Sequence, residues 1–256
     1  MNNMSTFDIS TLSAALPEIF LLSAIVVVLL LDLFLTKPFK QVTYYLTQIS
    51  LLITAVLAFN LIDQPQVIIF GGSFILDNMA SVFKVFMLIS TMVAMVYSRH
   101  YLSQHSLFRG EYFVLVLLAV LGMMVMVSGY SLLTLYLGLE ILSLSLYTLI
   151  AIARKRASAV EAALKYFVLG AIASGLLLYG MSMIYGISGS LNINEIAAFS
   201  ANANLAPRET LILNFGLVFL VIGIAFKLGA VPFHMWVPDV YQGAPTSVTM
   251  FLSTVP

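Results

Sequence analysis

Long apolar runs follow one another along most of the sequence. Seven of them approach or exceed the ~20 residues that an α-helix needs to cross a bilayer, and they occupy 17–35, 43–62, 79–97, 112–127, 131–152, 160–185 and 209–229. A further apolar stretch begins near Thr246 and continues to Pro256. None alternates between apolar and polar positions, as a barrel strand of about 10 residues would. The pattern predicts an all-α, polytopic bundle of transmembrane helices, with about seven complete spans and the start of an eighth.

The composition agrees with a membrane protein and excludes several other classes. Of the 256 residues, 61% are hydrophobic and 9% are charged, whereas soluble domains carry roughly 25% charged residues. Basic and acidic residues number 11 each, so the net charge is zero and no basic surface for nucleic acid is expected. The chain has no cysteine, which excludes disulfides and thiolate ligands for zinc or iron–sulfur clusters.

Basic residues are distributed unevenly among the loops between the predicted spans. One set of loops holds seven of them, namely Lys37, Lys40, Arg99, Arg109, Arg154, Lys155 and Arg156, and the alternate set holds Arg208 alone. Basic loops stay on the cytoplasmic side of a membrane. This asymmetry predicts that residues 154–156 face the cytoplasm and that the N-terminus lies outside.

Two segments on the outer side are more than simple turns. Residues 66–76 are rich in β-forming side chains around Gly71 and Gly72, and they predict a small hairpin. Residues 191–202 place apolar side chains at helical spacing, which indicates a short amphipathic helix at the membrane interface. Neither segment carries residues that indicate catalysis.

Glu140 is the clearest ionisable residue inside a predicted span, because it lies in the middle of the run 131–152. A charge at such a depth costs at least ~2.5–3.5 kcal/mol. Tyr136, Ser143 and Tyr147 share the same helix face and form a polar stripe with it. Such a stripe must face the bundle interior or internal water. We interpret it as part of a proton path, and a neutral structural glutamate is the alternative.

Lys165 lies in the first third of the run 160–185. Glu161 precedes it by one helical turn, which is a stabilising arrangement, and a lysine near a bilayer boundary can extend its ammonium towards the headgroups. A structural and a functional role are therefore both open. Small residues follow at Gly170, Ala171, Ser174 and Gly175, a spacing typical of close helix packing. From this spacing we expect Lys165 to face inward.

Lys227 precedes the segment Gly229–Pro232, where proline removes a helical hydrogen bond and clashes with the previous turn of the helix. The seventh helix is therefore expected to break near Gly229–Pro232. Lysine at a broken helix is a recurring element of transporter ion sites, and a lysine at the membrane interface is the alternative. His234 follows the break and is a candidate proton relay, whereas Trp236 is expected at the headgroup boundary.

The remaining lysine and histidine residues give weaker indications of function. Lys84 lies near the outer end of its predicted span, and His100 and His105 lie in a predicted cytoplasmic loop without metal-ligand spacing, so no functional role is assigned to them. Motifs for dinucleotides, phosphate loops, zinc hydrolases and serine hydrolases do not occur in the sequence. The remaining chemistry is a row of buried acids and bases, which suits the movement of protons or small cations.

Residues 226–246 read Phe-Lys-Leu-Gly-Ala-Val-Pro-Phe-His-Met-Trp-Val-Pro-Asp-Val-Tyr-Gln-Gly-Ala-Pro-Thr. This stretch resembles the antiporter-like membrane subunits of respiratory complex I, the bacterial NADH-quinone oxidoreductase. Glu140 in Leu-Glu-Ile-Leu-Ser-Leu and Lys165 in Ala-Leu-Lys-Tyr-Phe-Val-Leu-Gly match the same family. The resemblance covers the whole chain and is most specific between Lys227 and Thr246.

The resemblance implies a proton-translocating subunit with no redox centre of its own. Glu140 would pair with Lys227, and Lys165 and His234 would complete the set of proton-translocating residues. The complex would use NADH, FMN, iron–sulfur clusters and quinone in other subunits, and this chain would bind no cofactor and no metal. Its partners would be the other membrane-arm subunits and the lipid bilayer. Its place would be the bacterial inner membrane, with a periplasmic N-terminus.

Members of this family carry two inverted helical repeats and are about twice as long. We therefore divide the chain into three N-terminal helices at 1–110 and a first antiporter-like repeat at 111–256, cut off inside its eighth span, and expect it to be an N-terminal fragment. A subunit of a Mrp-type cation/proton antiporter or of a membrane hydrogenase is one alternative. A purely structural membrane-arm subunit, whose buried charges only fix helix packing, is another.

Overall fold

The computed structural model describes residues 9–35, 40–201 and 205–256. Seven of the described helices are long and apolar enough to cross a membrane: α1 (Leu16–Phe34), α2 (Lys40–Phe59), α3 (Asn78–Gln104), α4 (Gly110–Val127), α5 (Leu132–Ile150), α6 (Ala157–Ser188) and α8 (Pro207–Lys227). The shorter helices are α7 (Ile193–Ser200), α9 (Trp236–Gly243) and α10 (Thr246–Thr254), with 3-10 turns η1 (Ile9–Ala15) and η3 (Phe70–Gly72). The predicted all-α membrane bundle with seven complete spans is confirmed, and α10 begins at Thr246, where the sequence predicts a further apolar helix.

Both predicted outer segments are present. Strands β1 (Val67–Ile69) and β2 (Phe74–Leu76) form an antiparallel hairpin, with Ile69 opposite Phe74. The amphipathic segment predicted at 191–202 folds as α7. Residue 202 itself lies outside the described ranges. The end of the bundle that carries β1 and β2 is called the hairpin end below. Of the basic residues used for orientation, Lys37 falls outside the described ranges.

The prediction that Arg99 and His100 lie in a loop is wrong, because α3 continues through both residues to Gln104. Hydropathy underestimates the length of this helix for a physical reason. The 27 residues of α3 span ~40 Å at 1.5 Å per residue, which exceeds the ~30 Å of hydrocarbon. Its last turns therefore extend beyond the apolar layer and tolerate polar side chains. There the Arg99 guanidinium lies 5.0 Å from the ring centroid of Tyr44.

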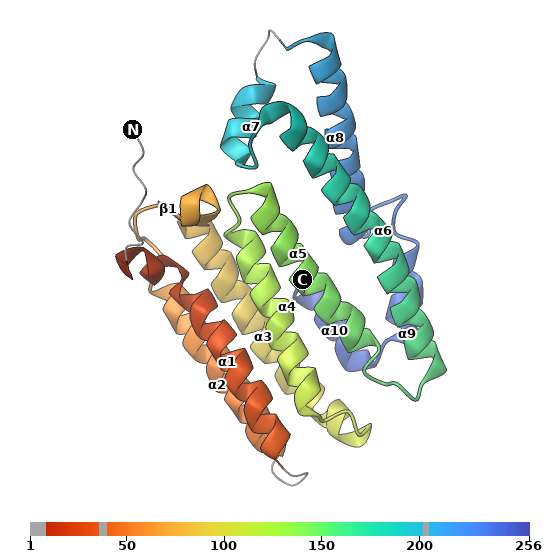
Figure 1. Ribbon diagram of the computed structural model, residues 1–256. Coiled ribbons are helices and arrows are strands. Elements are labelled where there is room, and N and C mark those ends of the chain that lie inside the picture. The colour runs from red at the N-terminus through yellow and green to blue at the C-terminus, as the bar shows by residue number, and fades with distance from the viewer. Residues whose placement is uncertain (1–8, 36–39, 202–204) are drawn as a thin grey trace.

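The helices are packed as two close pairs, which stand beside the N-terminal helices. Figure 1 shows α6 and α8 side by side, with α4 and α5 forming a second pair next to α1, α2 and α3. Glycines bring the backbones together within each pair. A Cβ added at Gly138 of α5 would lie 2.7 Å from the backbone nitrogen of Met126 in α4. In the other pair, a Cβ at Gly180 of α6 would lie 2.6 Å from the carbonyl oxygen of Gly216 in α8.

Replacement of Gly138 by alanine is expected to destabilise the protein by about 1–3 kcal/mol, because the new methyl group would overlap the backbone of α4. Gly175 is the matched control, since an added Cβ there meets nothing within 4 Å. Gly175→Ala should leave stability unchanged or raise it by up to ~1 kcal/mol, the helix-propensity gain. Unfolding in mixed micelles with increasing denaturing detergent measures both. Equal stability of the two variants would contradict the close packing of α4 on α5.

Backbone contacts at the hairpin end fix where α5 begins. Phe74 of β2 forms an isolated bridge with Gly129, and Ser131 forms another with Asn192. The Asn192 side chain also donates a hydrogen bond to the carbonyl oxygen of Gly72, at 3.3 Å. The hairpin, the α4–α5 loop and the start of α7 are therefore held together, and they position the first turn of the helix that carries Glu140.

The predicted break after Lys227 is confirmed. Helix α8 ends at Lys227, and Gly229 adopts a left-handed backbone with φ of +64°, a conformation that glycine adopts without strain. The chain then passes Pro232 and resumes as α9. Trp236, which the sequence predicts at the headgroup boundary, is buried and donates a hydrogen bond from its indole nitrogen to the carbonyl oxygen of Phe226 at 2.9 Å. This bond satisfies a carbonyl at the end of α8.

Candidate functional site

Glu140 of α5 and Lys227 of α8 form an ion pair between the two close helix pairs. The Nζ–Oε1 distance is 3.8 Å, and the side chains are 22% and 10% exposed, respectively. Lys227 is the last residue of α8, so the break directly after it leaves its ammonium at the end of a helix. The distance is within the range of an ion pair but too long for a hydrogen bond between the two charges.

Hydroxyl groups, and not the opposite charge, make the hydrogen bonds of this pair. Lys227 Nζ donates to Ser143 Oγ at 2.7 Å and to Tyr147 OH at 3.3 Å. Glu140 Oε1 accepts a hydrogen bond from Ser174 Oγ of α6. Ser143 and Tyr147 belong to the polar stripe that the sequence predicts beside Glu140, and the structure confirms that this part of the stripe faces inward. Three helices thus contribute to one polar cluster.

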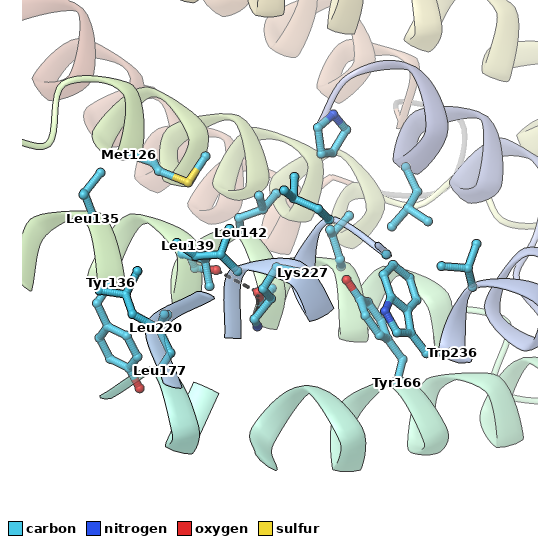
Figure 2. Close-up of a pocket in the computed structure, with 18 of the residues that line it drawn as sticks. Met126, Leu135, Tyr136, Leu139, Leu142, Tyr166, Leu177, Leu220, Lys227 and Trp236 are labelled. Carbon is cyan, nitrogen blue, oxygen red and sulfur yellow. Dashed lines mark hydrogen bonds between the residues drawn. The ribbon is translucent and has the colours of Figure 1, made fainter. Parts of the chain in front are cut away.

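A cavity of about 460 Å³ adjoins this cluster. Most of its lining is apolar, and Figure 2 shows Lys227 among leucines of α5, α6 and α8, with Tyr166 and Trp236 nearby. Lys227 and Ser143 contribute polar groups to the lining. The lysine ammonium therefore lies between the carboxylate of Glu140 and a space large enough to admit water molecules.

Lys165 does not join this cluster, and the expectation that it faces inward is wrong for the described chain. Its side chain is 45% exposed, and its Nζ lies 2.9 Å from both Glu161 Oε1 and Asp239 Oδ2. Ser174 is nine residues further along α6, which at 100° per residue places it on the opposite helix face. The small residues of α6 therefore do not share one face with Lys165. The ion pair with Asp239 ties α6 to α9.

His234 lies in the segment between α8 and α9, and its side chain is exposed. Its carbonyl oxygen accepts a hydrogen bond from the backbone nitrogen of Val237 at 3.0 Å, at the start of α9. The residue is absent from the lining of the cavity described above. The structure therefore brings together Glu140 and Lys227 among the four candidate residues, and leaves Lys165 and His234 apart from them.

A second buried ion pair was missed by sequence reasoning. Lys84 Nζ of α3 lies 2.6 Å from Glu18 Oε1 of α1, and the two side chains are 1% and 8% exposed. The ammonium also lies 5.1 Å from the ring centroid of Phe74 in the hairpin. The sequence assigns Lys84 no functional role, and the structure adds its buried pairing with Glu18. The available signal was that an acid and a base interrupt two separate apolar runs near the same side of the membrane.

Metal binding has no support from the arrangement of side chains. Within residues 9–35, 40–201 and 205–256, no three His, Asp or Glu side chains gather closely enough to hold a metal ion. The side chains gathered at the site are an acid, a base and hydroxyl groups. Such a set can hold a proton, exchange it with water in the cavity and respond to a change in the separation of two charges.

The fold and the buried pair define a polytopic membrane protein with ionisable groups packed between helices. A family described as "NADH:quinone oxidoreductase/Mrp antiporter, TM" matches residues 129–256, and the chain belongs to this family. Among curated proteins, it is 85% identical over 256 residues to NADH-quinone oxidoreductase subunit N of Ruthia magnifica, covering 100% of this chain and 53% of the relative. The subunit N of Thioalkalivibrio sulfidiphilus is 49% identical over 251 residues, covering 98% and 52%, respectively.

Solved structures of respiratory membrane complexes share the fold. A chain of respiratory complex I from Thermus thermophilus with bound aureothin matches with a TM-score of 0.77 and 32% identity, covering 93% of this chain and 50% of that one. A chain of the membrane-bound sulfane sulfur reductase, an archaeal respiratory membrane complex, matches with a TM-score of 0.81 and 26% identity, covering 94% and 50%. The chain thus spans about half the length of the curated relatives it matches, between 50% and 53%.

Proposed function

We propose that the complete protein is a proton-translocating membrane-arm subunit of NADH-quinone oxidoreductase. It would couple electron transfer from NADH to quinone, carried out in other subunits, to proton movement through buried acids and bases. The observation that carries this proposal is the Glu140–Lys227 pair, with its charges 3.8 Å apart beside a cavity. The names of the curated relatives support the assignment to this complex.

The geometry suggests how the pair would handle a proton. At an effective dielectric constant of 20, unit charges 4 Å apart interact by roughly 4 kcal/mol. Moving Lys227 towards or away from Glu140 would therefore change strongly how tightly the lysine holds its proton. Ser143 and Tyr147 offer the ammonium an alternative partner. The lysine would alternate between the carboxylate and these hydroxyls, and would exchange its proton with water in the cavity when the carboxylate is distant.

We assign Lys165 and His234 supporting roles at the opposite end from the hairpin. The basic loop at 154–156 supports a cytoplasmic position for the start of α6. Lys165, with Asp239 and Glu161 at 2.9 Å, and the exposed His234 would then lie where protons enter from the cytoplasm. The protein would reside in a bacterial inner membrane with its N-terminus in the periplasm. Residues 1–110 would form an N-terminal unit of three helices, and residues 111–256 the first antiporter-like repeat.

Partners and cofactors follow from the same proposal. Large apolar side chains such as Phe215, Val218 and Val221 of α8 are more than half exposed, and other membrane-arm subunits and lipid would cover such faces. NADH, FMN, iron–sulfur clusters and quinone would be bound in other subunits of the hetero-oligomer. This chain's own contribution would be to hold and release protons between α5, α6 and α8.

The test is neutralisation of both charges in the complete protein within its complex. Glu140→Gln combined with Lys227→Met should lower the number of protons moved per NADH oxidised to the level that the other subunits sustain. The control combines Glu195→Gln with Lys155→Met, which removes the same charges from exposed positions and should leave the ratio unchanged. Vesicle acidification and NADH oxidation are measured together.

An assembled complex with an unchanged proton ratio would refute the assignment and favour a structural membrane-arm subunit. Cation/proton exchange by the complete protein in the absence of NADH and of the redox subunits would instead favour a Mrp-type antiporter. Both outcomes contradict the proposal, and they differ in whether the complete protein transports ions without NADH and the redox subunits.

A further inference from the structure

Ser174 makes an unusual hydrogen bond for a buried serine in a membrane helix. The hydroxyls of Ser145, Thr91 and Thr54 each donate to the backbone carbonyl one turn earlier in their own helix, at 2.7 Å. Ser174 instead donates across helices to Glu140 Oε1. The residue is only 6% exposed, so bulk water does not compete strongly for this bond. A hydrogen bond to a charged group is worth more than one between neutral groups.

The bond is directed at the oxygen that faces Lys227. Oε1 is also the carboxylate atom 3.8 Å from Lys227 Nζ. The bond from Ser174 fixes the position of that oxygen, and the nearest hydrogen bond of Lys227 goes instead to Ser143 Oγ, at 2.7 Å. Ser143 in turn donates to the carbonyl oxygen of Leu139 at 2.8 Å, so its oxygen is free to accept from the ammonium. Each charge is thus bonded to a serine of the opposite helix pair.

Ser174 and Lys227 also belong to the same closely packed pair of helices, α6 and α8. A Cβ added at Gly223, one turn before Lys227, would lie 2.7 Å from Leu177 Cβ and 3.2 Å from the carbonyl oxygen of Ala173. Ala173 and Leu177 flank Ser174 on α6. A displacement of α6 and α8 relative to α5 would therefore move the Ser174 hydroxyl and the Lys227 ammonium together across the face that carries Glu140 and Ser143.

We propose that Ser174 is a positioning residue that holds Glu140 apart from Lys227 and transmits movement of the α6–α8 pair to the carboxylate. This inference rests on the proposed function and deepens it at the same site. With the Ser174 hydroxyl in place, the two charges remain separated and exchangeable. Without it, the carboxylate is no longer held in place and can turn towards Lys227, the pair closes, and the lysine no longer alternates between its partners.

The experiment compares three substitutions in the complete protein, assembled in its complex, with proton transport expressed per assembled complex. Ser174→Ala should lower transport about tenfold, the effect expected from losing one hydrogen bond to a charged group. Ser174→Thr retains the hydroxyl and should keep most of the activity. Ser174→Cys is similar in size but donates weakly, and should fall between the two. Ser182→Ala, an exposed serine of the same helix, is the control and should behave as the unsubstituted protein.

A role in packing alone would give a different order, because cysteine would then match serine and threonine would be the most disruptive. That order, or full activity of Ser174→Ala, would overturn the inference. The Glu140→Gln, Lys227→Met protein separates this failure from that of the proposed function. If it loses transport while Ser174→Ala does not, only the role of Ser174 is refuted. If it retains transport, the proposed function itself is refuted at this site.

Discussion

Replacement of Lys84 by methionine is expected to cost about 3–5 kcal/mol of folding stability, because it leaves Glu18 buried without its counter-charge. The pair is closed, with 2.6 Å between Nζ and Oε1 and exposures of 1% and 8%. Within the described residues, Glu18 and Lys84 have no side-chain hydrogen-bond partner in addition to this ion pair. Unfolding in mixed micelles, together with the yield of folded protein in membranes, measures the effect.

The double variant Lys84→Met, Glu18→Leu should recover most of this loss, because replacing a buried ion pair by apolar side chains is often neutral or stabilising. Lys155→Met, which removes a lysine from an exposed loop, is the matched control and should unfold like the parent protein. A single variant as stable as this control would show that water reaches Glu18. A double variant as unstable as the single one would show that the lysine contributes packing and not charge.

The two buried pairs differ in the features that separate a fixed contact from an exchangeable one. Glu18 and Lys84 are in direct contact, and Phe74 of the hairpin packs against the ammonium at the hairpin end. Glu140 and Lys227 are 3.8 Å apart and are bonded to hydroxyls. A cavity adjoins the second pair and supplies room for exchange with water. The first pair therefore suits the anchoring of α1 to α3, and the second suits proton transfer.

Much of the fold could be predicted because its determinants are local in sequence. Apolar length indicates each span, and Gly229 with Pro232 indicates the break after Lys227. The inward position of Ser143 and Tyr147 follows from their helical spacing around Glu140. The helix ends were less predictable, because α3 extends past the hydrocarbon layer and so includes Arg99.

Contacts between helices could not be predicted from one sequence, since periodicity gives the relative positions of residues on a helix but not the helix's rotation in the bundle. Lys165 was expected to face inward with the small residues of α6, yet Ser174 faces α5 and Lys165 the opposite side. The pairing of Glu18 with Lys84 depends on how α1 and α3 are placed. The pairing of Glu140 with Lys227 was expected only through resemblance to a known family.

Replacement of Glu140 by alanine, with Lys227 left in place, is expected to stop proton movement through this subunit and to destabilise the protein by about 3 kcal/mol or more. The change leaves a lysine ammonium that is 10% exposed without a counter-charge. Ser143 and Tyr147 continue to accept its hydrogen bonds, so we place the loss at the lower end of the range for an orphaned buried charge. Micelle unfolding and vesicle acidification measure the two effects separately.

Comparison with Glu140→Asp and with the Glu140→Ala, Lys227→Met double variant shows whether the orphaned charge causes the loss of stability. Aspartate keeps the charge but shortens the side chain by one methylene, so stability should be largely retained while transport falls. The double variant removes the orphaned charge and should be more stable than Glu140→Ala, although it moves no more protons, because residues that act as a unit have non-additive effects. If instead the double variant were less stable than either single variant, the two side chains would contribute independently, and the ion pair could not be the element that links stability to proton movement.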